Sequence, residues 1–470
     1  MLQPEIEQRS VHSLLIPSSA AAIPVHVVST GTWPALQEKL PAAGRSFALA
    51  QGFAGRAGQH CLLPDPQGAL AAVLLGVDTA GRRPDPFAAG RLAATLPAGD
   101  YLISGEIGDP ALATLSWLLQ GYRFDRYRKP NPVRARLVVP DGVDGEEISL
   151  IAESAMLARD LVNTPANELG PGEIEAAIRG LAAECGAAVA SIVGDDLIAR
   201  NFPMIHAVGR ASTRAPRLID LVWGDPAHPK VTLVGKGVAF DTGGLNLKPD
   251  ASMLLMKKDM GGAAAAFAAA RMIMLAKLPV RLRLLVPAVE NAVSGNAFRP
   301  GDVLASRKGL SVEIGNTDAE GRLILGDALA LADEEAPEVL VDFATLTGAA
   351  RTALGPELPP FYTHDDKLAG EIARLGMAVN DPVWRLPLWP PYDAMLDSKI
   401  ADVNHVSSGG MAGSVTAALF LNRFVEKTKA YAHFDIYAWN PSAKPGRPEG
   451  GECQGARLIH ALVKQLYPRG

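Results

Sequence analysis

Along the first 145 residues, short hydrophobic runs alternate with glycine, proline and polar turns, as is typical of mixed α/β chains. The apolar runs Ala69–Val77 (ALAAVLLGV) and Arg134–Pro140 (RARLVVP) predict buried strands. Asp141–Gly145 (DGVDG) is rich in turn residues. We therefore predict a smaller N-terminal α/β domain over residues 1–145 and a larger α/β domain over residues 146–470.

The larger domain alternates predicted helices and strands. Its expected helices are Glu147–Val162, Glu173–Cys185 and the alanine-rich Met260–Leu278. Continuous apolar runs predict strands at Leu218–Trp223, Val231–Val234, Arg281–Val289 and Val339–Leu346. This alternation predicts a central, mostly parallel sheet. Sites in such sheets lie at the carboxyl ends of the strands.

Composition and charge narrow the class of protein. The 470 residues include 45 basic and 50 acidic side chains, for a net charge of −5, so no nucleic-acid partner is expected. Three distant cysteines, Cys61, Cys185 and Cys453, form neither a disulfide framework nor a CxxC metal site. The N-terminus is acidic, and no run is long and apolar enough to span a membrane. These features predict a cytoplasmic protein without a membrane partner.

Several common catalytic motifs are absent from the sequence. It contains no HExxH or HxxEH zinc motif, no GxSxG nucleophile motif, no phosphate-binding P-loop and no GxGxxG fingerprint after a strand. The nine histidines are scattered singly. Any metal chemistry must therefore rest on carboxylates.

The segment Val234–Pro249 (VGKGVAFDTGGLNLKP) places charged residues directly after a predicted buried strand. Lys236 and Asp241 flank what we expect to be an apolar turn, and Lys248 follows seven residues after Asp241. An ordinary alternative is a strand-to-loop junction with a solvated lysine–aspartate pair.

A second segment, Met253–Ala264 (MLLMKKDMGGAA), places Asp259 just before the alanine-rich helix. Taken alone, an aspartate in this position is commonly a helix cap. Its neighbours Gly261 and Gly262 also mark the start of that helix.

The third segment is Gly315–Leu325 (GNTDAEGRLIL), in which Asp318, Glu320 and Arg322 are spaced two apart. In an extended backbone these three side chains would share one face. The alternative is a surface turn with a carboxylate–arginine pair. The apolar residues that follow pin this segment to a core.

Together the three segments supply four carboxylates, those of Asp241, Asp259, Asp318 and Glu320. If they converged without counter-charge they would repel one another strongly. Two divalent cations would resolve this repulsion, and hard oxygen ligands suit Mn²⁺, Mg²⁺ or Zn²⁺. Paired metal ions are a common hydrolytic arrangement.

At these residues the chain resembles the leucyl aminopeptidases, peptidase family M17. NTDAEGRL (Asn316–Leu323) is identical to the signature octapeptide of that family, and the two other segments match its metal-binding segments. The further matching segments are Leu161–Pro171 (LVNTPANELGP), Ser294–Leu304 (SGNAFRPGDVL) and Asp342–Ala349 (DFATLTGA). The resemblance spans about Glu147 to Asp435.

The resemblance implies two divalent metal ions per chain, Mn²⁺ or Zn²⁺ first and Mg²⁺ or Co²⁺ as alternatives. Asp241 and Glu320 would bridge the two ions. Asp318 would complete the more exchangeable site, and Lys236, as a neutral amine, would complete the tighter site with Asp259.

The same resemblance implies catalytic and substrate-binding roles. Lys248 would stay cationic and polarise the scissile carbonyl. Arg322, with the backbone near Gly321 and Leu346, would hold a bicarbonate ion that serves as general base. The positions that match the pocket for the first side chain of the substrate are Met256, Thr345 and Gly348.

Residues His433–Ser442 (HFDIYAWNPS) depart from the family pattern. Tyr437 falls where a small residue is common and where that pocket is closed, so its ring would narrow or reshape the pocket.

The function implied is a metal-dependent aminopeptidase that acts on peptides with a free N-terminus and assembles as a homohexamer. Two alternatives stay open: a regulatory or binding protein on this scaffold, and a dimetal hydrolase of another ester or amide bond.

Overall fold

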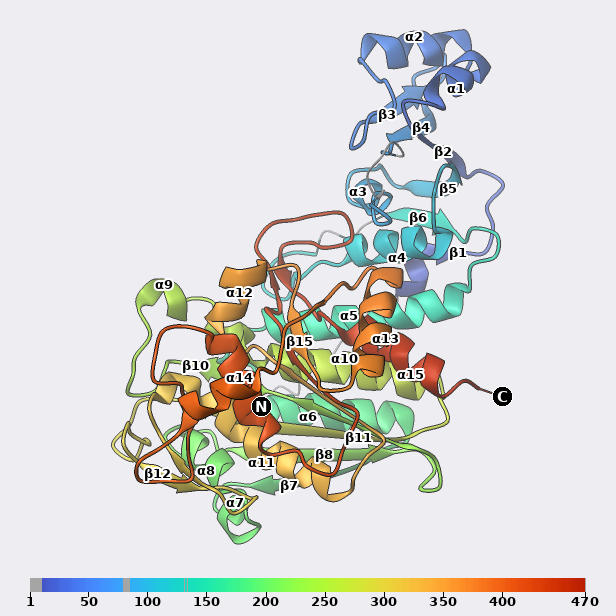
Figure 1. Ribbon diagram of the computed structural model, residues 1–470. Helices are drawn as coiled ribbons and strands as arrows, with labels where there is room; N and C mark the ends of the chain where they lie inside the picture. The colour runs from blue at the N-terminus through green and yellow to red at the C-terminus, as the bar shows by residue number, and fades with distance from the viewer. Residues whose placement is uncertain (1–10, 79–84, 131, 133, 470) are drawn as a thin grey trace. The chain divides into compact units, whose positions relative to one another are not determined.

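The computed structural model describes residues 11–78, 85–130, 132 and 134–469 (Figure 1). The chain forms two compact units. The N-terminal unit comprises Met1–Met156 and Ser442–Glu449. The larger unit comprises Leu157–Pro441 and Gly450–Gly470, and we name it the catalytic unit because it contains the three charged segments of the sequence analysis. Within the described ranges, no helix has both the length and the apolar character needed to cross a membrane.

The N-terminal unit is built on a six-stranded sheet in the order β1-β6-β5-β2-β4-β3. Its strands are β1 (Leu15–Ile16), β2 (Ile23–Val28), β3 (His60–Pro64), β4 (Leu70–Gly76), β5 (Gly99–Gly105) and β6 (Ala135–Val138). Neighbouring strands are parallel except β3 and β4. β4 and β6 confirm the two strands predicted within residues 69–77 and 134–140, and both are largely buried.

Short helices surround this sheet. They are the 3-10 helix η1 (Val11–Leu14) and the α-helices α1 (Trp33–Lys39), α2 (Ala42–Ala50), α3 (Gly90–Ala93) and α4 (Pro110–Gly121). Asp109 caps α4 by accepting hydrogen bonds from two backbone N–H groups of its first turn. α4 buries Trp117 completely, and the indole N–H of Trp117 donates to the carbonyl of Ala135 in β6 at 3.1 Å.

A segment from far along the chain completes the N-terminal unit. The backbone N–H of Gly446 donates to Oε1 of Gln120 at 2.8 Å, and the guanidinium of Arg447 lies 5.0 Å from the ring centre of Phe87. Ser442–Glu449 therefore belongs with the first 156 residues in space. The predicted domain boundary after residue 145 did not include this return of the chain to the N-terminal unit. The boundary itself stays a prediction.

The catalytic unit is built on a nine-stranded sheet in the order β16-β15-β18-β14-β9-β11-β8-β7, with β10 paired to β11. Its strands are β7 (Ala188–Val193), β8 (Arg217–Trp223), β9 (Lys230–Gly235), β10 (Gly237–Asp241), β11 (Arg281–Asn291), β14 (Val339–Ala344), β15 (Pro360–Tyr362), β16 (Trp384–Arg385) and β18 (Tyr431–Asp435). The central strands β18, β14, β9 and β11 are mutually parallel, as predicted. Smaller sheets contain β12 (Val303–Ala305), β13 (Ser311–Glu313), β17 (Val403–Asn404), β19 (Trp439–Asn440) and β20 (Gly450–Gly451).

Helices cover both faces of the large sheet. They are α5 (Gly145–Asn163, which crosses the boundary between the units), α6 (Pro171–Cys185), α7 (Asp196–Ala199), α8 (Pro203–Gly209), α9 (Asp250–Met253), α10 (Gly261–Leu275), α11 (Glu320–Glu334), α12 (Gly348–Leu354), α13 (Asp366–Ala378), α14 (Gly413–Asn422) and α15 (Ala456–Leu466). The 3-10 helices are η2 (Met256–Met260), η3 (Thr317–Ala319) and η4 (Pro390–Leu396). α10 packs with α6 and α15 on one face, and α11 packs with α8 and α14 on the other (Figure 1).

Two predicted elements end earlier than expected. The helix predicted to reach Leu278 ends at Leu275, because Pro279 disfavours helical geometry in the residue before it. Lys277 instead takes a positive φ of 50°. The strand predicted to reach Leu346 ends at Ala344, because the chain leaves the sheet there to form a loop at its carboxyl edge.

Candidate active site

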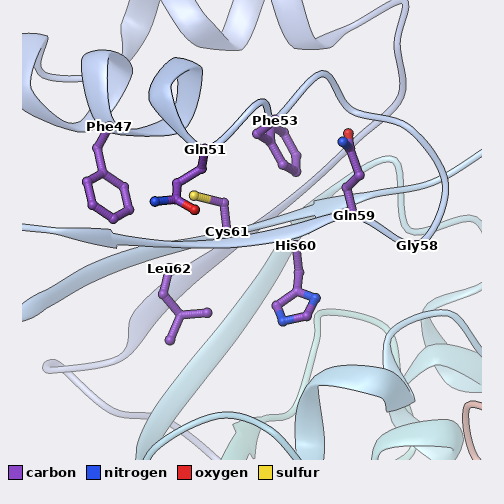
Figure 2. Close-up of a pocket in the computed structure, with 8 residues that line it drawn as sticks. All are labelled: Phe47, Gln51, Phe53, Gly58, Gln59, His60, Cys61 and Leu62. Atoms are coloured by element: carbon purple, nitrogen blue, oxygen red, sulfur yellow. The ribbon is translucent and has the colours of Figure 1, made fainter.

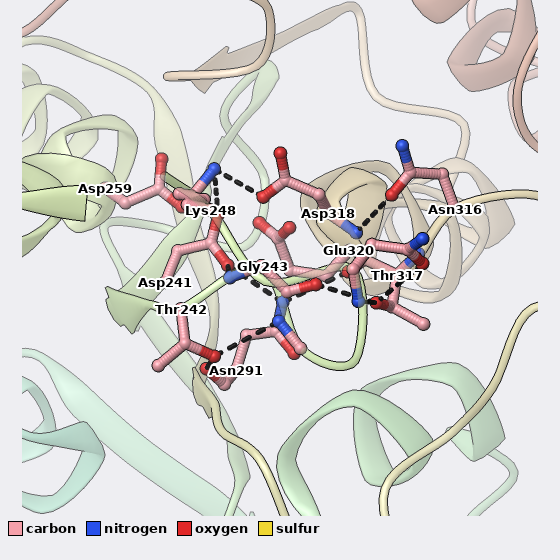
Figure 3. A network of polar contacts seen from close by, with 12 residues as sticks. Asp241, Thr242, Gly243, Lys248, Asp259, Asn291, Asn316, Thr317, Asp318 and Glu320 are labelled. Atoms are coloured by element: carbon pink, nitrogen blue, oxygen red, sulfur yellow. Dashed lines mark hydrogen bonds and ion pairs between the residues drawn. The ribbon is translucent and has the colours of Figure 1, made fainter. Parts of the chain in front are cut away.

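Charged side chains from separate segments meet at the carboxyl edge of the central strands. Lys236 directly follows β9, and Asp241 ends β10. η2 contributes Asp259, and the first residue of α11 is Glu320. One carboxylate oxygen from each of Asp241, Asp259 and Glu320 lies within 4.8 Å of the others, and all three residues are buried. Figure 3 shows them facing one another, with Asp318 beside them.

Two lysines are interleaved with these carboxylates. Lys236 Nζ lies 2.8 Å from Asp259 Oδ2 and 3.0 Å from Glu320 Oε1. Lys248 Nζ lies 2.8 Å from Asp241 Oδ2 and also pairs with Asp318 Oδ1 (Figure 3). The ordinary alternative for the first segment, a solvated Lys236–Asp241 pair, is therefore wrong. The expected apolar turn between them is also wrong, because residues 237–241 form β10 beside β11.

The electrostatics of this cluster favour additional positive charge. Burial raises the pKa of Asp241 to about 6, and the negative charge of Asp259 adds to this effect while Lys248 and Lys236 oppose it. Burial and the charge of Asp241 likewise raise the pKa of Glu320 well above its ordinary value. Burial alone would lower the pKa of Lys236, but the surrounding carboxylates prevail and raise it. Four carboxylates thus face two ammonium groups.

The donor set fits divalent metal ions. Both carboxylate oxygens of Glu320 are buried and lack a hydrogen-bond partner among the described residues, although Oε1 is close to Lys236 Nζ. Asp259 Oδ2 and Asp318 Oδ1 are also buried without a hydrogen-bond partner among the described residues, and each forms an ion pair with a lysine. Buried, incompletely bonded carboxylate oxygens are the ligands that hard divalent cations take.

Asp259 does not cap the helix that follows it. The N-terminal cap position of α10 is Met260, and no side chain caps it. The carboxylate of Asp259 instead accepts a hydrogen bond from Thr345 Oγ1 at 2.7 Å and pairs with Lys236. The capping alternative is therefore wrong.

The expected extended geometry of the third segment is also wrong. Asp318 lies in η3, whereas Glu320 and Arg322 lie in the first turn of α11. Asn316 causes the difference, because its side chain accepts a hydrogen bond from the backbone N–H of Asp318 at 2.8 Å and starts the turn. The turn still directs Asp318 and Glu320 toward the cluster (Figure 3).

Arg322 is buried next to the carboxylate cluster. Its Nη1 donates to the carbonyl of His405 at 2.7 Å, while its Nε has no hydrogen-bond partner in the described part of the chain. Burial lowers the pKa of Arg322 to about 10, and Glu320 and Asp435 oppose that shift. An arginine with an unused buried N–H fits a small anion.

The backbone positions expected near that anion have their own constraints. An added Cβ on Gly321 would lie 2.5 Å from Cε of Lys236, so only glycine leaves room for the lysine stem. The N–H of Leu346 already donates to Asp435 Oδ1 at 3.0 Å. The residues expected to line the pocket for the first side chain lie along η2 (Met256), directly after β14 (Thr345) and at the start of α12 (Gly348).

Two polar residues of the site were not singled out from the sequence. Asn291 ends β11, and its Nδ2 donates to Asp241 Oδ1 at 2.8 Å and to the carbonyl of Thr317 at 3.1 Å (Figure 3). Asp435 ends β18 and accepts hydrogen bonds from the loop after β14, including one from Thr347 Oγ1 at 2.6 Å. Both are polar residues at the end of an apolar strand, which is the signal that could have found them.

Two family models match this chain. The description "Cytosol aminopeptidase family, catalytic domain" matches residues 156–460, and "M17 aminopeptidase, N-terminal domain" matches residues 23–140. A probable cytosol aminopeptidase of Syntrophotalea carbinolica is 40% identical over 391 residues, which is 78% of each chain. Another, of Caulobacter vibrioides, is 37% identical over 450 residues, which covers 89% of this chain and 90% of the relative.

Solved structures extend the similarity to the fold. The crystal structure of cytosol aminopeptidase from Coxiella burnetii has a TM-score of 0.91 and 45% identity, and the match covers 97% of this chain and 99% of that one. The bottromycin maturation enzyme BotP in complex with Mn has a TM-score of 0.86 and 34% identity, covering 95% and 100%. With matching domains, full-length relatives and a shared fold, this chain belongs to the M17 cytosol aminopeptidase family of peptidases.

Proposed function

We propose that this protein is a dinuclear-metal aminopeptidase that removes the first residue from peptides with a free α-amino group. One observation carries the proposal: Asp241, Asp259 and Glu320 bring carboxylate oxygens within 4.8 Å of one another in a buried site. A related structure, the enzyme BotP, was solved in complex with Mn. We therefore expect Mn²⁺ or Zn²⁺ to bind here, with Mg²⁺ and Co²⁺ as alternatives.

The residues that would hold the ions are those of the carboxylate cluster. Asp241 and Glu320 are the most enclosed and would bridge two ions. Asp318, whose side chain is 34% exposed, would belong to the more exchangeable ion. Asp259 and Lys236 would complete the tighter site, and Lys236 must lose its proton to act as a ligand. When bound, such ions supply Lewis acidity and lower the pKa of water.

Lys248 is the residue that we expect to stabilise developing negative charge. Burial opposes its protonation, but Asp241 and Asp318 prevail and raise the pKa of Lys248, so it stays cationic at neutral pH. Its ammonium group can donate to the oxygen of the scissile carbonyl as that oxygen becomes negative. Asp241 and Asp318 hold Lys248 in place from two sides (Figure 3).

Arg322 is the residue that we expect to hold a small anion near the reacting peptide bond. Its unused Nε and its burial fit bicarbonate, which supplies a general base when bound. The engaged N–H of Leu346 implies that Arg322, rather than that amide, provides the main contact.

A substrate panel tests the proposal. Aminoacyl anilides are incubated with and without Mn²⁺, each beside its N-acetylated twin. We expect metal-dependent cleavage of the free-amine compounds only, because the α-amino group must reach the metal site. Equal cleavage of the acetylated twins would contradict the exopeptidase function. Absence of cleavage by protein that contains two metal ions per chain would contradict the hydrolase function.

Assembly and location remain predictions. Family resemblance is the basis for the homohexamer, and mass photometry of the purified protein measures that state directly. The cytoplasmic location and the absence of a nucleic-acid partner rest on sequence features such as the net charge of −5. A band-shift titration with duplex DNA at physiological salt checks the latter.

A further inference from the structure

Lys258 is a buried lysine that makes no ion pair with any carboxylate in the described part of the chain, although Asp259 and Asp435 act on its charge from a greater distance. It lies in η2 directly before Asp259, and only 2% of its surface is exposed. The site lysines Lys236 and Lys248 each pair with two carboxylates. By contrast, no described residue forms a hydrogen bond or an ion pair with Lys258 Nζ, and its close partner is the ring of Tyr437, 5.0 Å away at the centroid. Buried charges ordinarily have a close partner, and an anionic group of a ligand would supply the one that is missing here.

A second cation lies over the same ring. The guanidinium carbon of Arg351 in α12 is 4.6 Å from the ring centre of Tyr437. Arg351 Nη1 donates to the carbonyl of Thr347 at 3.1 Å, and no described carboxylate pairs with this guanidinium. The negative face of an aromatic ring attracts cations at such distances. Tyr437 therefore holds two positive groups near each other without neutralising either.

This group of three residues borders the reaction site. Lys258 adjoins Asp259, whose carboxylate accepts the hydrogen bond from Thr345. Ala438, the residue after Tyr437, packs tightly against the junction of η2 and α10. A Cβ added to Gly261 at that junction would lie 2.2 Å from the Cβ of Ala438. Gly348 begins α12, which also carries Arg351, and a Cβ on Gly348 would be in ordinary van der Waals contact with Nη2 of Arg351, at 3.6 Å. The two cations thus adjoin the segments expected to line the pocket for the first side chain.

We propose that Lys258 and Arg351, held over the ring of Tyr437, select the first side chain of the substrate by charge, so that acidic N-terminal residues are preferred. This inference rests on the aminopeptidase function proposed above, because it requires a substrate whose N-terminus is anchored at the metal site. A glutamate side chain gains charge-assisted hydrogen bonds from the two cations. A lysine side chain meets like charge and is rejected.

The direct test compares substrates of equal shape and different charge. Anilides of glutamate, glutamine and lysine are hydrolysed by the native, metal-loaded enzyme. We expect kcat/KM to be about tenfold higher for glutamate than for glutamine, the difference that one charge-assisted hydrogen bond makes. Lysine should rank below glutamine. The preference should lie mainly in KM, because the contact is made equally in the ground state and the transition state.

Matched variants identify the residues that cause the preference for glutamate over glutamine. Lys258→Met keeps the length of the side chain and removes the charge, so the glutamate-to-glutamine ratio should fall toward one. Lys257→Met is the control: Lys257 Nζ donates to the carbonyl of Asn163 at 2.6 Å, and this change should leave the ratio as in the native enzyme. Tyr437→Phe keeps the ring and should keep the ratio, whereas Tyr437→Leu should lower it.

The outcomes separate this inference from the function on which it rests. Equal kcat/KM for glutamate and glutamine in the native enzyme, with free-amine cleavage intact, would overturn the charge selection and leave the aminopeptidase standing. A ratio that survives both Lys258→Met and Arg351→Met would also overturn it. If no free-amine anilide is cleaved, the aminopeptidase function fails, and the inference fails with it. The native panel requires no variant to fold.

Discussion

Each unit has parallel strands whose carboxyl ends lie along one edge of its own sheet. The side chains at these two edges differ in chemistry. In the N-terminal unit, the loops that follow β2 and β5 bring Ser29 and Thr32 close to the carboxylate of Glu106. Thr32 Oγ1 donates to Glu106 Oε2 at 2.9 Å, and the backbone N–H of Ser29 donates to Thr32 Oγ1 at 3.0 Å. Hydrogen bonds from Ser29 and Thr32 lower the pKa of Glu106 against a small effect of burial. The protein itself stabilises this carboxylate.

At the corresponding edge of the catalytic unit, the protein leaves its carboxylates incompletely bonded. Asp241 and Glu320 are buried, and their pKa values are raised. Topology therefore positions loops in both units, but only buried, unbalanced charge indicates a metal site.

A hollow in the N-terminal unit differs in chemistry from the carboxylate cluster of the catalytic unit. The N-terminal unit has a hollow of about 490 Å³ beside β3, shown in Figure 2. Its lining contains no carboxylate and no lysine or arginine; the residues are Phe47, Gln51, Phe53, Gly58, Gln59, His60, Cys61 and Leu62. The hollow therefore lacks the charged oxygen ligands that the carboxylate cluster of the catalytic unit supplies to hard divalent cations.

The strongest test of the contrast removes one carboxylate from each edge. Asp259→Asn should lower turnover roughly 1,000-fold or more and lower the bound metal, since even groups that only orient a metal ligand contribute 10- to 100-fold. Glu106→Gln, the control in the N-terminal unit, should change neither. Steady-state kinetics and metal analysis of the purified proteins measure both quantities. Full metal content in Asp259→Asn would remove that residue from the ligand set.

A smaller effect is expected when a lysine of the site is removed. Lys248→Met should lower turnover roughly 100- to 1,000-fold, the usual cost of losing one donor to a developing oxyanion. Its metal content should stay nearly unchanged, because Lys248 pairs with the carboxylates and is not expected to be a ligand. Loss of metal together with activity would show that Lys248 orders the ligands instead of stabilising the reacting oxygen.

The two units can also be compared by how much an ion pair in each contributes to the free energy of unfolding. Arg159 and Glu452 in the catalytic unit form a pair at 2.9 Å with side chains 0% and 6% exposed. Arg136 and Asp100 in the N-terminal unit form one at 2.7 Å, but the arginine side chain is 49% exposed. Glu452→Gln should cost about 3 kcal/mol of unfolding free energy, because a buried charge loses its partner. Asp100→Asn should cost under about 1 kcal/mol. Urea denaturation measures both.

The same buried pair predicts an acid-sensitive catalytic unit. Burial opposes ionisation of Glu452, but Arg159 and Arg457 prevail and lower its pKa to about 2. A carboxyl group whose folded-state pKa lies below its unfolded value stabilises the fold above the unfolded pKa. That contribution should be lost as the pH falls from about 4.5 toward 2. Glu452→Gln should remove this part of the pH dependence, and a persistent acid transition of equal size would assign it to other carboxyls.

Much of the fold could be predicted from local pattern. The strands β4, β8, β9 and β11 and the helices α5 and α6 match the predicted segments within a few residues, because each is an apolar run or an amphipathic period bounded by turn residues. Errors occurred at ends and junctions. Residues 237–241 were expected to be a turn, yet they pair with β11, a partner 50 residues further along the chain.

The sequence by itself determined the residue types that converge at the site and the strand–helix alternation that supports them, because periodicity and motif spacing are local properties. Tertiary structure decided the contacts between distant residues. Asn291 donates a hydrogen bond to Asp241, and the backbone of Gly446 donates one to Gln120 in the N-terminal unit. The ring of Tyr437 contacts one cation from η2 and another from α12. Such contacts depend on strand order and on which charges burial leaves without a partner, and neither property is encoded by any single stretch of the chain.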